Sequence, residues 1–299
     1  MTVFTPYGLG IAAAFAATLG LAGLLLRRRI SLRSWLQWGC AALGISWLTA
    51  RLVYVLGDAT YYLTTLSRPD LALRFWDGGY AMSGAIIGWL LAARLLEKPL
   101  KLPRCSLVAA AATALPLGLM IARLTETGTG MGLGREILTP WLAFLGVPDE
   151  TGLIVHPVRL YEAAAAAVLL IVLLMSRLPD RDKPLLLLTV YGASQALLES
   201  LRNDGHLVVH FVRIQQVLAL FMLFFALLMW TRRLRHNRRE QWIAWGIVLA
   251  ATAAAVAMEF VVDSSENKLL TYAVMAACMT AAAWATLRAG KRARMKEST

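Results

Sequence analysis

The chain has 299 residues, of which 59% are hydrophobic and 16% are charged, and its mean hydropathy is +0.61. Soluble domains carry about 25% charged residues, so this composition excludes a soluble enzyme and an intrinsically disordered chain. The formal charge of +12 comes from basic residues that lie in short clusters between apolar stretches. That pattern is typical of membrane topology, and we expect no nucleic-acid partner.

Nine apolar stretches are long enough to be membrane-spanning helices, each of which needs about 20 residues. They lie near 7–26, 35–56, 79–96, 105–124, 157–177, 184–203, 210–230, 242–261 and 268–288. The first has no basic region before it and no small-residue cleavage site after it, so we expect a retained helix. The sequence therefore predicts an all-α, polytopic transmembrane helix bundle of about nine helices.

The basic clusters orient this bundle. They follow every second stretch, at residues 27–33, 94–104, 177–183, 232–239 and 288–296, and hold 21 of the 30 Lys and Arg residues. Placing them in the cytoplasm puts the N-terminus outside and the C-terminus inside. The three cysteines lack a zinc-site spacing, so we expect neither a metal nor a cofactor.

Four of the other arginines lie toward the outer ends of apolar stretches: Arg51, Arg123, Arg159 and Arg202. Charges within a membrane are costly unless they are paired or hydrated, so each is a functional candidate. Guanidinium groups around an outer cavity would form a phosphate site. The alternative is that they make structural ion pairs or reach the lipid headgroups, and we expect Arg51, Glu162 and Glu199 to form such ion pairs.

Two further patterns belong to the same predicted region. Tyr191, Gln195 and Glu199 recur at four-residue steps and form a polar stripe on an apolar helix. The glycine-rich run from Thr125 to Gly134 follows an apolar helix, so it predicts a flexible outer loop near the site rather than a dinucleotide fingerprint, with a phosphate-binding nest as an alternative. Gly84 and Gly88 have the spacing of small residues in close helix packing.

These segments, in this order, resemble the prolipoprotein diacylglyceryl transferase family between about Arg51 and Leu220. The residues that carry the resemblance are ARLVYV around Arg51, FWDGG from Phe75, HPVRLYEA from His156 and YGASQALLESLRND from Tyr191. The HPVRLYEA segment is the most specific. The chain departs from the family motifs where Ser83 replaces a histidine, Glu126 and Thr129 replace asparagines, Met131 replaces a glutamate, Gln195 replaces an arginine and Arg159 replaces a glutamine. We hypothesise that the arginine and the glutamine have exchanged helices.

The resemblance implies transfer of a diacylglyceryl group from phosphatidylglycerol to the lipobox cysteine of a preprolipoprotein. A cysteine thiolate attacks a glycerol carbon and glycerol phosphate leaves, so the site needs cations for the leaving phosphate and a base for the thiol. The expected catalytic residues are Arg123, Glu126, His156 and Tyr191, with His206 and His210 as weaker candidates for the base. The expected phosphatidylglycerol-binding residues are Arg123, Arg159, Arg202, Tyr161, Gln195 and Ser83.

The resemblance also implies a seven-helix transferase-like domain over residues 1–240, to which residues 241–299 add a C-terminal transmembrane hairpin with a basic tail. Membrane lipids are the expected surroundings, in the cytoplasmic (inner) membrane of a bacterium. Two alternatives stay open. One is a divergent paralogue that uses another lipid donor or acceptor, and the other is a non-catalytic lipid-binding protein or anion transporter.

Overall fold

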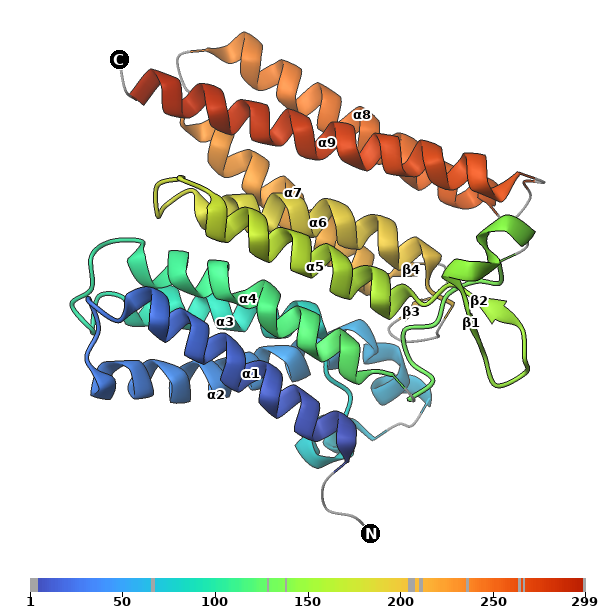
Figure 1. The fold of residues 1–299 in the computed structure, drawn as a ribbon, viewed down its shortest axis with the longest axis horizontal. Helices are drawn as coiled ribbons and strands as arrows, with labels where there is room; N and C mark the ends of the chain where they lie inside the picture. The colour runs from blue at the N-terminus through green and yellow to red at the C-terminus, as the bar shows by residue number, and fades with distance from the viewer. Residues whose placement is uncertain are drawn as a thin grey trace. The chain divides into compact units, whose positions relative to one another are not determined.

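The computed structural model describes residues 5–65, 68–127, 129–137, 139–203, 208–209, 212–234, 237–262, 265 and 267–297. Within these ranges the chain forms nine α-helices (Figure 1): α1 (Pro6–Leu26), α2 (Leu32–Gly57), α3 (Met82–Leu96), α4 (Ser106–Thr125), α5 (Val158–Met175), α6 (Lys183–Leu201), α7 (Ile214–Arg232), α8 (Arg238–Val262) and α9 (Lys268–Glu297). The predicted all-α fold class is confirmed.

The remaining elements are short. One π-helical turn, η1 (Tyr61–Thr65), and three 3-10 turns, η2 (Pro69–Leu73), η3 (Phe75–Asp77) and η4 (Pro140–Leu145), lie in the connections. Two antiparallel pairs of two-residue strands join β1 (Val147–Pro148) to β2 (Ile154–Val155) and β3 (Val208–Val209) to β4 (Val212–Arg213).

Eight of the described helices are long and apolar enough to cross a membrane, and the chain is a multi-pass membrane protein. The exception is α3, whose 15 residues fall short of the predicted span 79–96. It begins only at Met82 because Gly78 and Gly79 have φ angles of 79° and 74°, which lie in the left-handed region and are incompatible with a right-handed helix. The predicted third span is therefore a shorter helix preceded by a turn.

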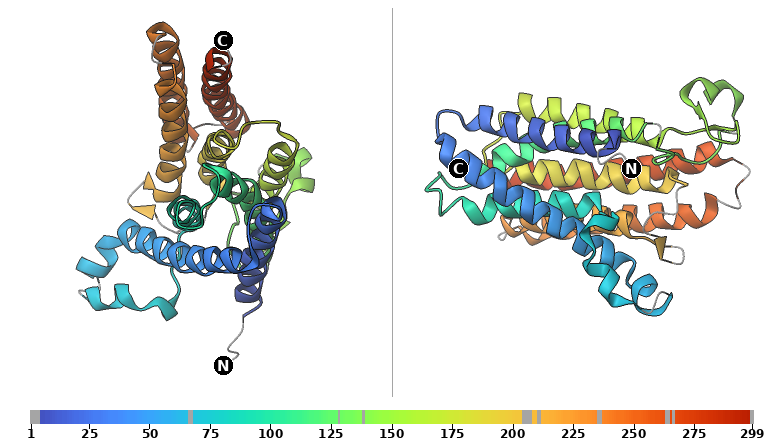
Figure 2. Two further views of the ribbon diagram at one scale, coloured as in Figure 1. Left: turned by 90° about the vertical axis from the view of Figure 1, so that its left-hand side faces the viewer. Right: turned by 90° about the horizontal axis from the view of Figure 1, so that it is seen from below.

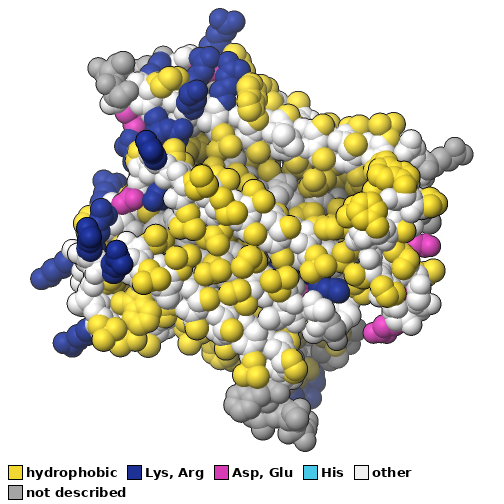
Figure 3. Space-filling view, in the orientation of Figure 1, with side chains coloured by type: hydrophobic (Ala, Val, Ile, Leu, Met, Phe, Trp, Pro, Cys, Tyr) yellow, Lys and Arg dark blue, Asp and Glu magenta, His cyan; other side chains and the backbone are white. Residues whose placement is uncertain are grey.

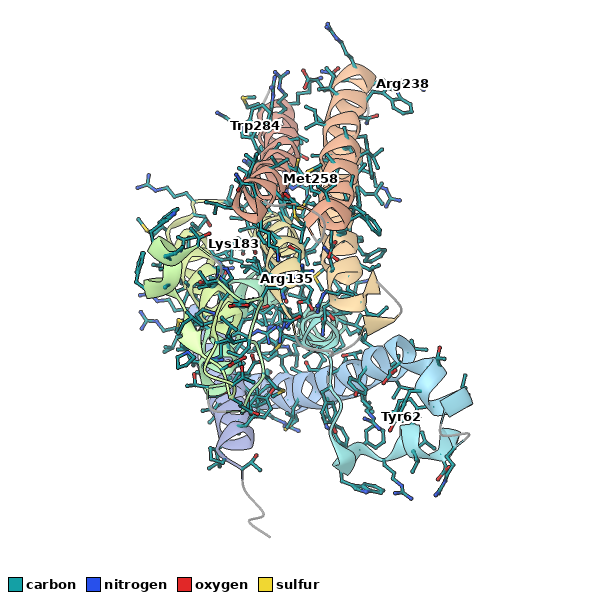
Figure 4. All side chains as sticks on the ribbon, turned by 90° about the vertical axis from the view of Figure 1, so that its right-hand side faces the viewer. Tyr62, Arg135, Lys183, Arg238, Met258 and Trp284 are labelled. Carbon is teal, nitrogen blue, oxygen red and sulfur yellow. The ribbon has the colours of Figure 1, made fainter. Side chains whose placement is uncertain are left out.

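The chain divides into two compact units, and the first comprises residues 1–184 and 202–215. Its central helix is α4, which packs against α1, α3 and α5, while α2 packs against α3. The end of α2 and the turns η1 to η3 reach out beyond the other helices of this unit (Figure 2). Tyr62 is labelled on this projecting segment in Figure 4.

Small residues allow the close helix contacts in the first unit. A Cβ atom built on Gly84 would lie 2.5 Å from the main-chain oxygen of Thr49, and one built on Gly88 would overlap the Thr49 hydroxyl. The hydroxyl of Thr49 donates a hydrogen bond to the Gly84 carbonyl oxygen at 2.8 Å. The predicted small-residue packing is confirmed, with α2 as the partner of α3.

The second unit comprises residues 185–201 and 216–299, and thus holds α6, α7 and the α8–α9 hairpin. Its core is a continuous apolar cluster to which all four helices contribute, including Ala193, Leu223, Val248 and Met279. In this unit Gln216 on α7 donates hydrogen bonds to the Ala196 carbonyl oxygen and to Glu259 on α8, at 3.2 and 2.9 Å. The domain boundary at residue 240 and the orientation of the termini stay predictions.

Candidate functional site

Four of the predicted site residues meet where α4 ends and α5 begins, within the first unit. In the last turn of α4, Arg123 places Nη1 2.6 Å from Glu126 Oε1 and Nε 2.9 Å from Glu162 Oε2. Arg202, which follows α6, places Nη1 3.3 Å from the same Glu162 oxygen. All four side chains are buried, so one carboxylate of α5 holds two guanidinium groups in a region with little water.

The glycine-rich loop after α4 connects these residues through its main chain. Gly134 and Arg202 form an isolated β-bridge, and the Gly134 N–H donates to the His156 carbonyl oxygen at 2.7 Å. The N–H of Arg159 donates to the Gly132 carbonyl oxygen at 3.0 Å. The loop therefore lies at the site, as predicted. Arg135, which follows it, is labelled in Figure 4.

Arg159 lies beside the ion-pair cluster, and no ion pair joins it to an acidic residue that the structure describes. Its Nη1 donates to the main-chain oxygen of Met131 at 3.3 Å, and its buried Nε has no hydrogen-bond partner among the described residues. The second oxygen of Glu126, Oε2, is also buried and unpartnered there. Both groups border Gly132, because a Cβ atom at that position would lie 2.7 Å from Arg159 Cβ and 2.9 Å from Glu126 Oε2.

The charges of the five residues named so far do not cancel. The three guanidinium groups of Arg123, Arg159 and Arg202 lie near two carboxylates, those of Glu126 and Glu162, and all five residues are at most 8% exposed. A buried excess of positive charge is costly unless an anion or water compensates it. The arrangement is therefore suited to bind an anion, with a planar donor group still available on Arg159.

His156 and Tyr161 form a separate pair. The ring nitrogen Nδ1 of His156 lies 3.2 Å from the Tyr161 hydroxyl, which donates to the Leu145 carbonyl oxygen at 3.3 Å. Successive residues of a helix are about 100° apart, so Tyr161 leaves α5 on a different face from Arg159 and Glu162. Burial lowers the pKa of His156, so its imidazole is neutral at pH 7 and has the protonation state of a base.

Two predicted residues of the first unit have other surroundings. Arg51 forms no ion pair with Glu162, one of its two expected acidic partners; Glu162 pairs with Arg123 and Arg202. Instead Arg51 donates to main-chain oxygens in the turns before α3, those of Leu71, Ala72, Gly78 and Gly79. Ser83 is 2% exposed in the first turn of α3, and its hydroxyl makes no hydrogen bond among the described residues.

The other predicted residues lie on α6, in the second unit. Gln195 Nε2 donates to Glu199 Oε2 at 3.2 Å, and both side chains are buried, so the predicted polar stripe does share one face of the helix. Tyr191 lies one turn earlier and is half-buried. His206 and His210 lie outside the described residues.

Two residues of the site carried no signal in the sequence. Tyr7, in the first turn of α1, interacts electrostatically with Glu126, Arg123 and Arg202, yet in the sequence it is one aromatic residue at the start of an apolar stretch. Gly132 has a φ angle of 68° and the close contacts described above, but six glycines and threonines around it make it indistinguishable from its neighbours in the sequence.

The fold and the buried cluster define a polytopic membrane protein with an arginine-rich site at the ends of its helices. Comparison with known proteins then identifies its family. The family model described as prolipoprotein diacylglyceryl transferase matches residues 2–232, and the chain belongs to this family. The α8–α9 hairpin lies beyond the matched residues.

Individual relatives are moderately similar. The chain is 31% identical to the phosphatidylglycerol–prolipoprotein diacylglyceryl transferase of Thermosynechococcus vestitus, over 57% of this chain and 66% of that protein. It is 30% identical to the enzyme of the same name from Trichormus variabilis, over 72% of this chain and 80% of the relative. The corresponding Bacillus velezensis protein is 27% identical over 63% of this chain and 72% of its own length.

Proposed function

We propose that the protein transfers the diacylglyceryl group of phosphatidylglycerol to the lipobox cysteine of a preprolipoprotein in the bacterial inner membrane. The cysteine sulfur forms a bond to the glycerol carbon, and the bond between that carbon and the phosphate oxygen breaks. The electron pair leaves with glycerol phosphate, and the thiol proton goes to a base. The names of the relatives support both substrates.

The observation that carries this proposal is the unpaired guanidinium of Arg159. It is buried, it has no carboxylate partner within the described part of the chain, and it borders the Arg123–Glu162–Arg202 cluster through the glycine loop. A phosphodiester bound there would receive donors that are already oriented and poorly hydrated. Such groups stabilise the negative charge that develops on a leaving phosphate.

The ion pairs of Glu162 have a positioning role in this proposal. The carboxylate holds Arg123 Nε at 2.9 Å and Arg202 Nη1 at 3.3 Å, so both guanidinium groups are fixed before substrate arrives. A fixed donor requires little reorganisation during the reaction, which is the basis of electrostatic catalysis. Arg123 also keeps Glu126 in place.

Glu126 is the better-placed base of the two candidates that the structure describes. Its Oε1 is held by Arg123 while Oε2 is left without a partner beside Gly132 and Arg159. The His156 ring is engaged with the Tyr161 hydroxyl on another face. We therefore assign the acceptance of the thiol proton to Glu126 and a structural role to His156 and Tyr161.

The test is mass spectrometry of a lipobox peptide incubated with the purified protein and phosphatidylglycerol in detergent. Wild type should add a diacylglyceryl mass, and Arg159→Ala should reduce the rate at least 100-fold with unchanged expression. Arg68→Ala is the matched control, because Arg68 is exposed and its ion pair among the described residues is with Asp70, two positions along the chain. A folded wild-type protein that binds phosphatidylglycerol but transfers nothing would refute the proposal.

One observation favours a second candidate, a transferase with another lipid donor. Where the family motif has asparagine, this chain has Glu126, and its carboxylate neutralises part of the Arg123 charge at 2.6 Å. A less cationic site would prefer a less anionic headgroup. The same assay with phosphatidylethanolamine and cardiolipin distinguishes the donors, since the favoured lipid gives the fastest diacylglyceryl transfer.

The exchange of arginine and glutamine between Arg159 and Gln195 also stays a proposal. It predicts that Arg159→Gln inactivates the protein and that the double variant Arg159→Gln/Gln195→Arg recovers transfer. A double variant as inactive as the single one would refute the exchange.

A further inference from the structure

A polar cavity lies in the first unit, where α1 ends beside the start of α4 and the connection between α5 and α6. Its volume is about 410 Å³, and Leu24, Arg27, Arg28, Ser106 and Lys183 are among the residues that line it. Thr113, the lining residue of α4 nearest in sequence to Arg123, precedes it by ten residues, which is about 15 Å along a helix. The cavity is therefore separate from the site described above.

Its walls are strongly basic. Three consecutive arginines after α1 and Lys183 contribute four positive charges, against the single carboxylate of Asp180. Arg29 and Lys183 lie 3.3 and 3.9 Å from Asp180, whereas Arg27 and Arg28 have no acidic partner among the residues that the structure covers. Figure 3 shows Lys and Arg side chains gathered along this left-hand edge, where Figure 1 places the end of α1.

The same cavity has an apolar side. Leu24 and Leu25, in the last turn of the membrane-spanning α1, are 63% and 43% exposed, and Ala109 and Ala110 of α4 complete the lining. The arginines begin where these leucines end. A ligand that fits both parts has an anionic group at the membrane surface and hydrocarbon chains in the bilayer.

We propose that this cavity binds the phosphate of an anionic phospholipid in the membrane leaflet that faces the basic clusters, predicted to be the cytoplasmic one. Arg27 and Arg28 bind the phosphate, and the acyl chains lie along Leu24 and Leu25. Each basic residue near an anionic lipid strengthens binding about fivefold, so loss of both arginines should weaken it roughly 30-fold. The lipid bound here is a structural ligand of α1 and α4 and is not consumed.

The experiment uses the full-length, delipidated protein in a neutral detergent and follows its thermal unfolding. Dioleoyl phosphatidic acid, which lacks the glycerol phosphate leaving group, should raise the unfolding temperature more than dioleoyl phosphatidylcholine. The double variant Arg27→Gln/Arg28→Gln should show a smaller difference, because only the proposed transfer site then still binds the anionic lipid. The control Arg238→Gln/Arg239→Gln removes the same charge from the exposed start of α8 and should keep the full difference.

Three outcomes would overturn the proposal: equal stabilisation by both lipids, full anionic-lipid stabilisation of the Arg27→Gln/Arg28→Gln variant, or the same stabilisation by inorganic phosphate alone, which would indicate a free-phosphate site. Diacylglyceryl transfer by this variant should match wild type. A negative transferase assay would therefore not count against the lipid site. A negative lipid-binding experiment would not count against the transferase activity.

Discussion

Glu162 is the residue whose replacement most directly tests the buried cluster. Glu162→Gln keeps the shape of the side chain but removes the charge that holds Arg123 Nε at 2.9 Å and Arg202 Nη1 at 3.3 Å. Two unit charges 4 Å apart attract each other by about 4 kcal/mol at an effective dielectric constant of 20. Breaking a buried ion pair by removing one partner costs about 3–5 kcal/mol. We expect a loss within that range, because the glutamine oxygen still accepts one hydrogen bond.

Thermal unfolding in detergent measures this loss. A destabilisation of about 4 kcal/mol corresponds to a fall of roughly 10 °C in the unfolding temperature for a chain of this size. Glu126→Gln should lower the unfolding temperature less than Glu162→Gln does, because Arg123 then keeps Glu162 as a partner. Asp70→Asn is the exposed control and should leave it unchanged. If Glu162→Gln unfolds within about 2 °C of wild type, the two ion pairs are not the stabilising contacts that the geometry indicates.

Three further predictions follow from single positions. Gly132→Ala places a methyl group 2.7 Å from Arg159 Cβ, at a φ angle in the left-handed region. The rate of diacylglyceryl transfer should therefore fall at least tenfold, and the unfolding temperature should drop by a few degrees. An unchanged transfer rate would refute the tight packing of the loop at Gly132. Arg51→Lys cannot satisfy four carbonyl oxygens, so limited proteolysis between residues 57 and 82 should become faster, and an unchanged cleavage rate would contradict that role. Burial lowers the pKa of His156 in the folded protein, so the unfolded state binds this proton more readily. The wild-type protein should therefore lose stability as the pH falls below about 6.5, and His156→Gln should lose less over the same range. If the unfolding temperatures of the two proteins fall in parallel with pH, protonation of His156 does not destabilise the fold.

The apolar stretches predicted the helices well because membrane spans need long uniform runs. The third stretch was predicted to begin too early, because the left-handed backbone angles of Gly78 and Gly79 delay the start of the helix to Met82 and leave no trace in the hydropathy. Among charged residues, Arg123 and Glu126 were within reach of sequence reasoning because they are three residues apart on one helix.

The partners of more distant charges depend on tertiary contacts that no spacing reveals. Arg51 binds carbonyl groups of turns that lie 20 or more residues away, so no acidic residue in the sequence signals its surroundings. The contact of the Arg159 guanidinium with the Met131 carbonyl oxygen likewise depends on where the glycine loop passes. Both residues were recognised as important because a charge in an apolar stretch is unusual, but the chemistry of each came from the fold.

The order of the cluster along the chain has a consequence for biogenesis. Glu126 follows Arg123 within one helical turn, so this pair forms as soon as α4 emerges and lowers the cost of placing a charge in lipid. Glu162 arrives 39 residues after Arg123, and Arg202 arrives 40 residues after Glu162. The segment that brings Glu162 also brings Arg159, so the charges of these four residues balance once α5 has been made. A ribosome stalled between α5 and residue 202 would leave this set balanced, and the additional positive charge of Arg202 would appear only at the last step.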